Sequence, residues 1–484
     1  MLSSKELRIN KDTFLKHFNG CVDLNMRDIK IAEKTDACIL YIDTLVDKEV
    51  LNRDILARLL DIKKLPDNND DVIKYITENI IAQAKLKVVE LDNLAQHLIL
   101  TGCAVLLIDG QEKAISLSIQ GWTARPIQEP PTSVALKGPR EGFTEEININ
   151  ISLIRRRLPS PELVIHERFI GKYTKTKVCV CYLEDIADLD VVKEIEKRLD
   201  GISIDGIIDS AYIQAFLEPK NDYIFKQSGS SERPDVIAAK MLEGRVAIIV
   251  NGSPVVITIP FILIEDFQNP DDYYNKTGRA VFVRAIRILG VIFSLFLPGL
   301  YVAVQLYHYK VIPVRFLITI TNSTEGIPMT PAIEMLFVII LFEILYEASL
   351  RMPRYLGMAL SIVGGIIIGD MVIQSGIASP PAIIAVALSG LTIYTVPDAA
   401  PQLFLLRLGF TLMGIMLGFL GIVLGIIFII AHLATLDSYG GAYLSPWSPG
   451  ISEDKQDAIF KSKTENMTTR PEGIPNKNKV RAKK

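Results

Sequence analysis

The sequence predicts an α/β cytoplasmic region of two similar, duplicated subdomains, followed by an all-α multi-pass membrane domain. Three observations predict it: a repeat in the polar half, long uncharged runs in the other half, and a high apolar content. Of the 484 residues 49% are hydrophobic, and the mean hydropathy of +0.29 is high for a soluble chain. Residues 1–270 are polar and begin without a signal-peptide pattern, so we expect this half to stay in the cytoplasm.

The polar half carries an internal repeat. "KTDACILYIDTLVDKEVL" from Lys34 matches "KTKVCVCYLEDIADLDVV" from Lys175 at an offset of 141 residues. Further on, the Asp-Gly pair at 109–110 corresponds to the Asn-Gly pair at 251–252, at an offset of 142 residues. Each copy predicts a strand, an amphipathic helix and a closing hairpin, because these Gly-containing pairs tolerate the positive φ of a two-residue turn.

The segment between the two copies combines turn residues with charge. "GPREGF" has a turn-forming Gly-Pro followed by an Arg-Glu pair, and a run of three arginines follows. These charges could contact another subunit, form salt bridges within the subunit, or belong to a rigid solvated connector; the arginines could also bind phosphate or anionic lipid. The candidate contacts between subunits are Arg140, Glu141, Arg155, Arg156 and Arg157.

Three runs in the apolar half predict membrane helices. Residues 288–306 and 408–431 carry no charge, and 355–397 carry only Asp370. Uncharged stretches near 20 residues match the apolar thickness of a bilayer. Basic residues flanking the first run place its start in the cytoplasm.

The basic C-terminal tail should also be cytoplasmic, so the number of crossings after Arg354 should be even. We therefore expect four to five spans and take the proline-bounded "PPAIIAVALSGLTIYTVP" as a candidate re-entrant segment. If that segment crosses fully, either the tail lies outside or residues 401–432 bend. The expected organisation is an N-terminal extension (1–30), subdomain 1 (31–122), the connector (123–170), subdomain 2 (171–262), a juxtamembrane linker (263–287), the transmembrane domain (288–436) and a basic, disordered cytoplasmic tail (437–484).

The helix expected over 331–354 carries three carboxylates. Glu343 and Glu347 share one face, and because a charge facing lipid is costly, they should face the bundle interior or a water-filled cavity. The simpler explanation is that Glu347 pairs with Arg351 and that Glu334 lies near the outer headgroups, which leaves Glu343 within the span. The candidates for a pore or polar interior are Glu343, Glu347 and Asp370.

The next helix carries a face of small residues at every fourth position. Such a face allows helices to approach closely, either within one subunit or between copies around an axis. The residues of this helix-packing or pore face are Gly357, Ser361, Gly365 and Gly369.

No group of residues predicts catalysis, a metal site or a cofactor. The five histidines are scattered, and there is no phosphate-binding glycine loop after a strand, nucleophile elbow or metalloprotease helix. The Cys-x-Cys in "KVCVCYL" suits an alternating strand, because no histidine or second pair has ligand spacing. A net charge of −3 gives no reason to expect nucleic acid.

Several motifs resemble one known family. "KGPREGFTEEININISLIRRRL", "FQNPDDYY", "LPGLYVAVQLYH" and "SIVGGIIIGDMVIQSGIASP" resemble the A subunits of nutrient germinant receptors from endospore-forming bacteria, the GerA family. The resemblance runs from Lys34 to Pro449. It implies a multi-pass protein of the spore inner membrane, with its N-terminal domain on the core side and no catalytic residues.

The resemblance also implies partners and an activity. The partners are a transporter-like B subunit that binds the nutrient and a lipoprotein C subunit, and the A subunit oligomerises into a ring that forms a gated cation channel. The alternative is a pore-less signalling scaffold that couples the nutrient-binding partner to downstream germination machinery. A transporter is a third and weaker interpretation, because the apolar half of the sequence shows no repeated pair of broken helices.

Overall fold

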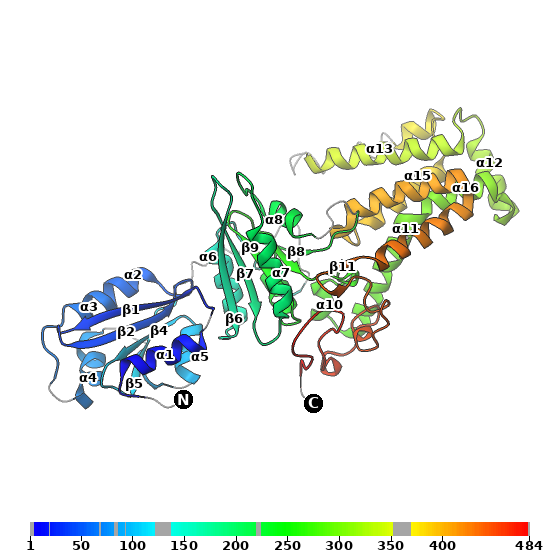
Figure 1. Cartoon of the computed structure of the whole chain (residues 1–484). Helices are drawn as coiled ribbons and strands as arrows, with labels where there is room; N and C mark the ends of the chain where they lie inside the picture. The colour runs from blue at the N-terminus through cyan, green and yellow to red at the C-terminus, as the bar shows by residue number, and fades with distance from the viewer. Residues whose placement is uncertain are drawn as a thin grey trace. The chain divides into compact units, whose positions relative to one another are not determined.

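The computed structural model describes residues 4–482 except 19, 67–68, 82–85, 92, 122–136, 219–223 and 352–368. The chain forms two compact units (Figure 1). The first unit is α/β and the second is helical, as the sequence predicts. The first comprises Met1–Ile262, Asp437–Ala442 and Glu465–Lys484, and the second comprises Leu263–Leu436 and Tyr443–Thr464.

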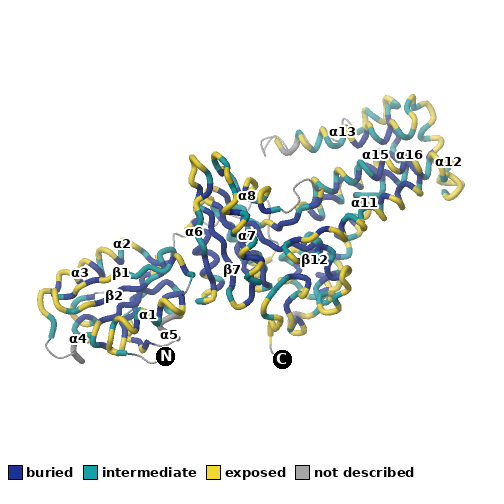
Figure 2. Tube along the Cα trace, in the orientation of Figure 1, coloured by how far each residue is buried: buried dark blue, intermediate teal, exposed yellow. Residues whose placement is uncertain are grey.

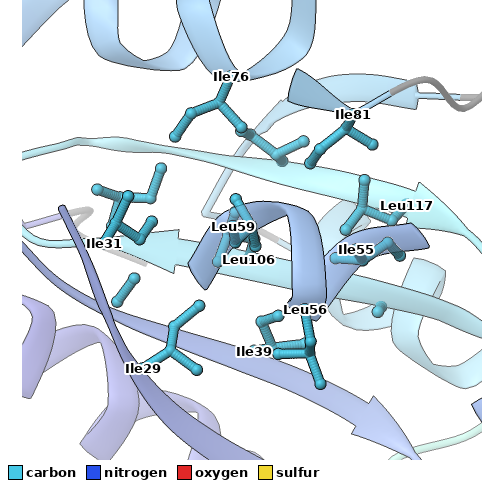
Figure 3. Packing of buried hydrophobic residues seen from close by; sticks show 14 of the residues in the cluster. Ile29, Ile31, Ile39, Ile55, Leu56, Leu59, Ile76, Ile81, Leu106 and Leu117 are labelled. Carbon is cyan, nitrogen blue, oxygen red and sulfur yellow. The ribbon is translucent and has the colours of Figure 1, made fainter. Parts of the chain in front are cut away.

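The first sheet has five strands in the order β1-β2-β4-β5-β3, with every neighbouring pair antiparallel. Its strands alternate apolar side chains to both faces, so helices cover both. One face packs on α1 and α5. The other packs on the helical segment that contains α3 and on α4, around Ile39, Leu59 and Ile76 (Figure 3). The elements are α1 (Leu7–His17), β1 (Leu24–Ile31), β2 (Thr35–Ile42), α2 (Lys48–Val50), α3 (Ala57–Leu60), α4 (Asn69–Tyr75), β3 (Leu86–Glu90), α5 (Asn93–Leu100), β4 (Cys103–Ile108) and β5 (Lys113–Ser118).

The second sheet has the corresponding order β6-β7-β9-β10-β8, again antiparallel throughout. Helices α6 and α9 cover one face and α7 and α8 the other, and the strands between them are buried (Figure 2). The elements are α6 (Ile147–Arg157), β6 (Leu163–Ile170), β7 (Thr176–Leu183), α7 (Leu189–Asp200), α8 (Ser210–Leu217), β8 (Gly229–Ser231), α9 (Pro234–Met241), β9 (Val246–Val250) and β10 (Val256–Ile259).

The β4–β5 hairpin of the first sheet and the β9–β10 hairpin of the second sheet have turns with the same contacts. Gly110 and Gly252 have φ of +82° and +90°. The side chain before each glycine accepts a hydrogen bond from the first residue of a helix: Leu7 N donates to Asp109 at 3.0 Å, and Ile147 N donates to Asn251 at 3.3 Å. Helices α1 and α6 therefore start at equivalent places.

The first helix of each sheet unit also shares an asparagine contact. Asn10 and Asn150 each exchange two hydrogen bonds with the backbone of a residue six positions earlier, Ser4 and Thr144 respectively. The segments expected as an N-terminal extension (1–30) and as a connector (123–170) thus each contain the first helix and first strand of a sheet unit. The strand signal is weak there, because β1 and β6 are edge strands with mixed polarity.

The C-terminal segment, expected to be a disordered tail, is instead packed. Ser438 accepts a hydrogen bond from Phe261 N at 3.0 Å and donates one to Gln227 O at 2.8 Å. Further along, Lys477 N donates to Ile186 O at 2.8 Å, and Ile474 is fully buried. The polar, basic composition of this segment does not reveal these contacts, because each is made by a single side chain or by a backbone group.

The second unit consists of long helices. Two described helices are long and apolar enough to cross a membrane, namely Thr277–Tyr307 and Pro397–Ala434, and Pro380–Ile393 is a shorter apolar helix. The elements are α10 (Pro270–Tyr274), α11 (Thr277–Tyr307), α12 (Val314–Thr324), α13 (Pro331–Arg351), α15 (Pro380–Ile393) and α16 (Ala400–Ala434).

Helix α16 folds back on itself at Gly418. This glycine has φ 62° and ψ −141°, which are not helical values. A Cβ on Gly425 would lie 2.7 Å from Met413 Sδ, although residues twelve apart in a straight helix are separated by about 18 Å. Residues 400–417 and 419–434 are therefore two antiparallel arms, and the bend considered for residues 401–432 occurs at this glycine.

Contacts from α11 stabilise the bend. Tyr307 OH donates to the carbonyl oxygens of Ile415 at 2.8 Å and Met416 at 3.3 Å, which the break in the helix leaves without their usual donors. The His308 ring stacks on Phe419, with centroids 4.3 Å apart. On the first arm, a Cβ on Gly414 would lie 2.5 Å from the carbonyl oxygen of Gly299, so two glycines let α11 and α16 touch through their backbones.

Where α11 begins, three charged side chains form a buried network. Asp272 of α10 is 2% exposed and accepts hydrogen bonds from Arg284 at 2.9 Å and from Arg287 at 2.7 Å. Arg284 also donates to Asp457 and to the carbonyl oxygen of Ala458. Burial raises the pKa of Asp272, but the hydrogen bonds and charges of Arg287 and Arg284 outweigh it and lower the pKa below its usual value.

We predict that Gly418→Ala destabilises the protein by about 1–3 kcal/mol, because the backbone conformation at 418 suits only glycine. Gly409→Ala is the matched control in the same helix, since no neighbouring atom of the described residues lies within 4 Å of its Cβ position. Thermal unfolding of the detergent-solubilised full-length protein measures both. Equal melting temperatures for the two variants would contradict the bend.

We predict that Asp272→Asn destabilises the protein by about 3–5 kcal/mol at pH 7, because the buried Arg287 loses its counter-charge and Arg284 loses one of its two carboxylate partners. The lowered pKa means that this stabilisation is present above the unfolded-state value of about 3.9 and is lost as the pH falls through the folded pKa. Unfolding at several pH values checks this, with exposed Glu325→Gln as control. A constant difference between the two variants down to pH 2 would refute the assignment.

Candidate functional site

The centre of the helical unit holds a buried arginine paired with a half-buried glutamate. Arg407 lies on the first arm of α16, and its side chain is 1% exposed. It donates to Glu343 Oε2 of α13 at 3.4 Å and to Ser389 Oγ of α15 at 3.4 Å. The Glu343 side chain is 31% exposed, so this carboxylate lies at the boundary between the bundle interior and its surface.

An open groove of about 540 Å³ runs along the outer side of this pair. Its walls are one face of α13 and a phenylalanine of α16. Glu347, expected to pair with Arg351, does so at 2.6 Å, and both side chains are exposed. The lining residues are Ile340, Glu343, Ile344, Glu347, Ala348, Arg351 and Phe404.

Glu334, expected near the headgroups, is instead buried inside the unit, with 1% exposure. Its carboxylate accepts a hydrogen bond from Ser379 N at 2.5 Å, at the N-terminus of α15. The partial positive charge of a helix N-terminus stabilises a carboxylate there. Glu334 thus joins the start of α13 to the start of α15.

The remaining membrane candidates do not join this site. Asp370 is exposed and accepts a hydrogen bond from Gln374 at 2.7 Å. No neighbouring atom in the described part of the chain lies within 4 Å of the Cβ position of Gly369. Gly357, Ser361 and Gly365 lie outside the described residues.

The connector charges bind mostly within the chain. Arg155 is fully buried and forms a two-pronged ion pair with Asp23, at 2.6 and 3.0 Å, which is the alternative of a salt bridge within the subunit. Glu141 pairs with Arg157 at 2.5 Å and with Arg156 at 3.5 Å. Arg140 at the neighbouring turn is exposed.

The cysteines form no reactive or metal-binding group among the described residues. All five are buried and unbridged. Burial raises the pKa of Cys179 to about 12, and burial together with Asp28 raises that of Cys38 to about 12. Since the thiolate is the reactive form, these thiols are inert at neutral pH. No cluster of three metal-binding side chains occurs in the described part of the chain.

Sequence reasoning missed Arg407, because it lies one residue before an uncharged run and resembles the charged boundary of a span. The available signal was the continuation of the apolar pattern back to Pro401, which places this arginine inside the helix. Asp272 was missed for a different reason: the members of its network come from α10, α11 and the segment at Asp457, which are far apart in sequence.

A family model described as "Bacillus/Clostridium GerA spore germination protein" matches residues 12–473. Spore germination protein KA of Bacillus subtilis (strain 168) is 36% identical over 99% of this chain and 89% of its own length. Spore germination protein B1 of the same strain is 31% identical over 97% of this chain and 98% of its own length.

Among solved structures, the N-terminal domain of the A subunit of the Bacillus megaterium spore germinant receptor GerK3 is similar to this chain. The match is 28% identical, covers 53% of this chain and 96% of the GerK3 chain, and has a TM-score of 0.43. The family match extends over both the α/β and the helical unit, and the motifs of the sequence had indicated the same relationship. The chain belongs to the Bacillus/Clostridium GerA family of spore germination proteins.

Proposed function

We propose that this chain is the A subunit of a nutrient germinant receptor, required for nutrient-triggered spore germination. The observation that carries the proposal is the family match over residues 12–473. Its partners are a transporter-like B subunit and a lipoprotein C subunit, and it lies in the spore inner membrane with the α/β unit on the core side. It acts by assembly and conformational change rather than by catalysis.

The proposal includes a multi-pass membrane domain. Successive contacts indicate the helix directions: Glu334 meets Ser379 and Tyr346 meets Tyr394, so α13 and α15 run parallel. Gly290 of α11 lies beside Thr395 just after α15, so these two helices run antiparallel. Many apolar side chains on the outer faces of these helices are exposed, which suits lipid or a neighbouring subunit, including Phe293, Ile340, Ile384, Leu420 and Phe428.

The bend at Gly418 supports a cytoplasmic tail. Residues 437–442 belong to the first unit, which α11 follows in the chain. The second arm of α16 therefore returns toward the side on which α11 begins. This agrees with an even number of crossings and removes the need for a re-entrant Pro380–Ile393 helix.

We further propose that several copies form a ring and that their helices enclose a gated cation channel. Glu343, Glu347 and Asp370 supply the polar interior, because carboxylates favour cations over anions. The open space beside Gly369 would allow another copy to approach. We propose that Gly357, Ser361 and Gly365 contact the same neighbouring copy. Arg140, Glu141, Arg156 and Arg157 remain proposed contacts between subunits.

The second candidate function is a pore-less signalling scaffold. The observation that favours it is the ion pair of Glu343 with Arg407, because a glutamate paired with a buried arginine has a structural role without any conduction. The two functions differ in whether removing the Glu343 charge alters ion passage.

The function is tested by deleting the gene in its own organism and measuring the loss of optical density of spores exposed to single nutrients. We expect the response to at least one nutrient to be lost and to return with the wild-type gene in trans. Germination by a nutrient-independent trigger is the control and should be unchanged. Normal responses to every nutrient, in a strain lacking paralogous receptors, would contradict the proposal.

We predict that Glu343→Gln alters the ions released during germination, because it removes a carboxylate while keeping the side-chain size. The expected result is a lower ratio of cation to anion release after nutrient addition. Glu325→Gln, which removes an exposed carboxylate outside the groove, is the control for the loss of one charge from the helical unit. Release with wild-type rate and selectivity in Glu343→Gln would favour the scaffold.

A further inference from the structure

Arg407 is an under-satisfied cation in an apolar setting. Its guanidinium has five N–H donors, yet within the described residues it makes two hydrogen bonds, both at 3.4 Å. Nε has no hydrogen-bond partner in the described part of the chain. The Phe404 ring lies 5.3 Å from the guanidinium and adds a weak cation–π attraction.

A buried arginine in a membrane helix requires a counter-charge, because its desolvation is costly. Glu343 is the carboxylate that supplies it. The neighbouring Ser389 provides no charge and donates its own hydrogen to Ser294 O at 2.8 Å. Loss of the Glu343 contact would therefore leave Arg407 with a neutral hydroxyl and an aromatic ring.

Glu343 also marks the place where the attachment of α13 weakens. Before it, Met335 and Ile339 are fully buried, and Phe342 packs against Gly390, whose missing side chain makes room for the ring. After it, none of the residues 344–348 is buried, and the Tyr346 ring contacts the Tyr394 ring.

We propose that the Glu343–Arg407 ion pair is a latch that holds the C-terminal half of α13 against α16 in the resting receptor. Release of the latch turns the Glu343 carboxylate from Arg407 into the groove beside Glu347 and lets this half of α13 move outward. Arg407 is thus a positioning residue for the carboxylate. The inference rests on the proposed function and assigns the regulation of its polar site.

The geometry makes the latch reversible. The pair is long, at 3.4 Å, and one partner is already in contact with the groove, so moving Glu343 requires a side-chain rotation and no rebuilding of the core. Arg407 cannot follow, because its side chain is 1% exposed and enclosed by the helices.

The test measures disulfide cross-linking of Ala348→Cys with Phe404→Cys, two residues on opposite walls of the groove, in membranes containing the full-length protein. The rate of cross-linking with Glu343 and Arg407 unchanged is the reference value. Arg407→Gln and Glu343→Gln should each reduce the rate about tenfold, which corresponds to about 1.4 kcal/mol. The control is Glu325→Gln, which removes an exposed carboxylate outside the groove and should leave the rate unchanged.

The charge-swapped variant Glu343→Arg/Arg407→Glu separates a latch from simple packing, because it restores the pair with reversed signs. Recovery of the cross-linking rate supports the latch, and failure to recover overturns it. If Arg407→Gln does not fold, Arg407→Lys replaces it, because lysine keeps the charge but lacks the planar guanidinium. An unchanged cross-linking rate for both Arg407→Lys and Glu343→Gln overturns the proposal.

Spore measurements distinguish this proposal from the channel itself. With the latch weakened, germination without nutrient should rise about tenfold in Arg407→Gln spores, the same factor as the cross-linking change, and return to wild type in the charge swap. Cross-linking that follows the expected order while no variant changes ion release supports the latch and contradicts the channel. Unchanged cross-linking contradicts the latch, whatever the spores do.

Discussion

A charged side chain that is buried needs an oppositely charged partner, because its desolvation is costly. Three buried ion pairs of this kind hold distant segments of the chain together. In the α/β unit Arg155 and Asp23 join the first helix of one sheet unit to the start of the other's first strand. Where the helices begin, Asp272 holds Arg284 and Arg287. Within the helices Arg407 holds Glu343. Each contact fixes two segments of the chain, because separating them would leave a buried ion unpaired.

The three contacts differ in how completely they are satisfied. Asp23 and Asp272 are nearly enclosed and accept short, multiple hydrogen bonds, which suits permanent joints. The Glu343 pair is longer and single, and its carboxylate is partly exposed. This difference in satisfaction is the basis for proposing that the Glu343 contact moves while the other two do not.

The sequence was sufficient for local features and insufficient for pairings between distant segments. Alternating apolar residues and the two Gly-containing turns indicated the central strands, and uncharged runs indicated α11 and α16. Neither pattern reveals that β1 and β6 lie at sheet edges, since edge strands tolerate mixed polarity. The partners of Arg155 and Arg407 were invisible for a related reason: residues 132 and 64 positions away meet only after the chain has folded. A bend within residues 401–432 was one of two open alternatives, and its place at Gly418 was not predicted, because the glycines of this run equally suit helix packing.

The packing of the C-terminal segment has a mechanical consequence. The chain passes between the two units four times, after Ile262, Leu436, Ala442 and Thr464. Severing one connection by proteolysis would leave three others intact. Directly after the second arm of α16, the Ser438 hydroxyl accepts a hydrogen bond from Phe261 N and donates one to Gln227 O. The two units are therefore joined at several points of the chain and not by one linker.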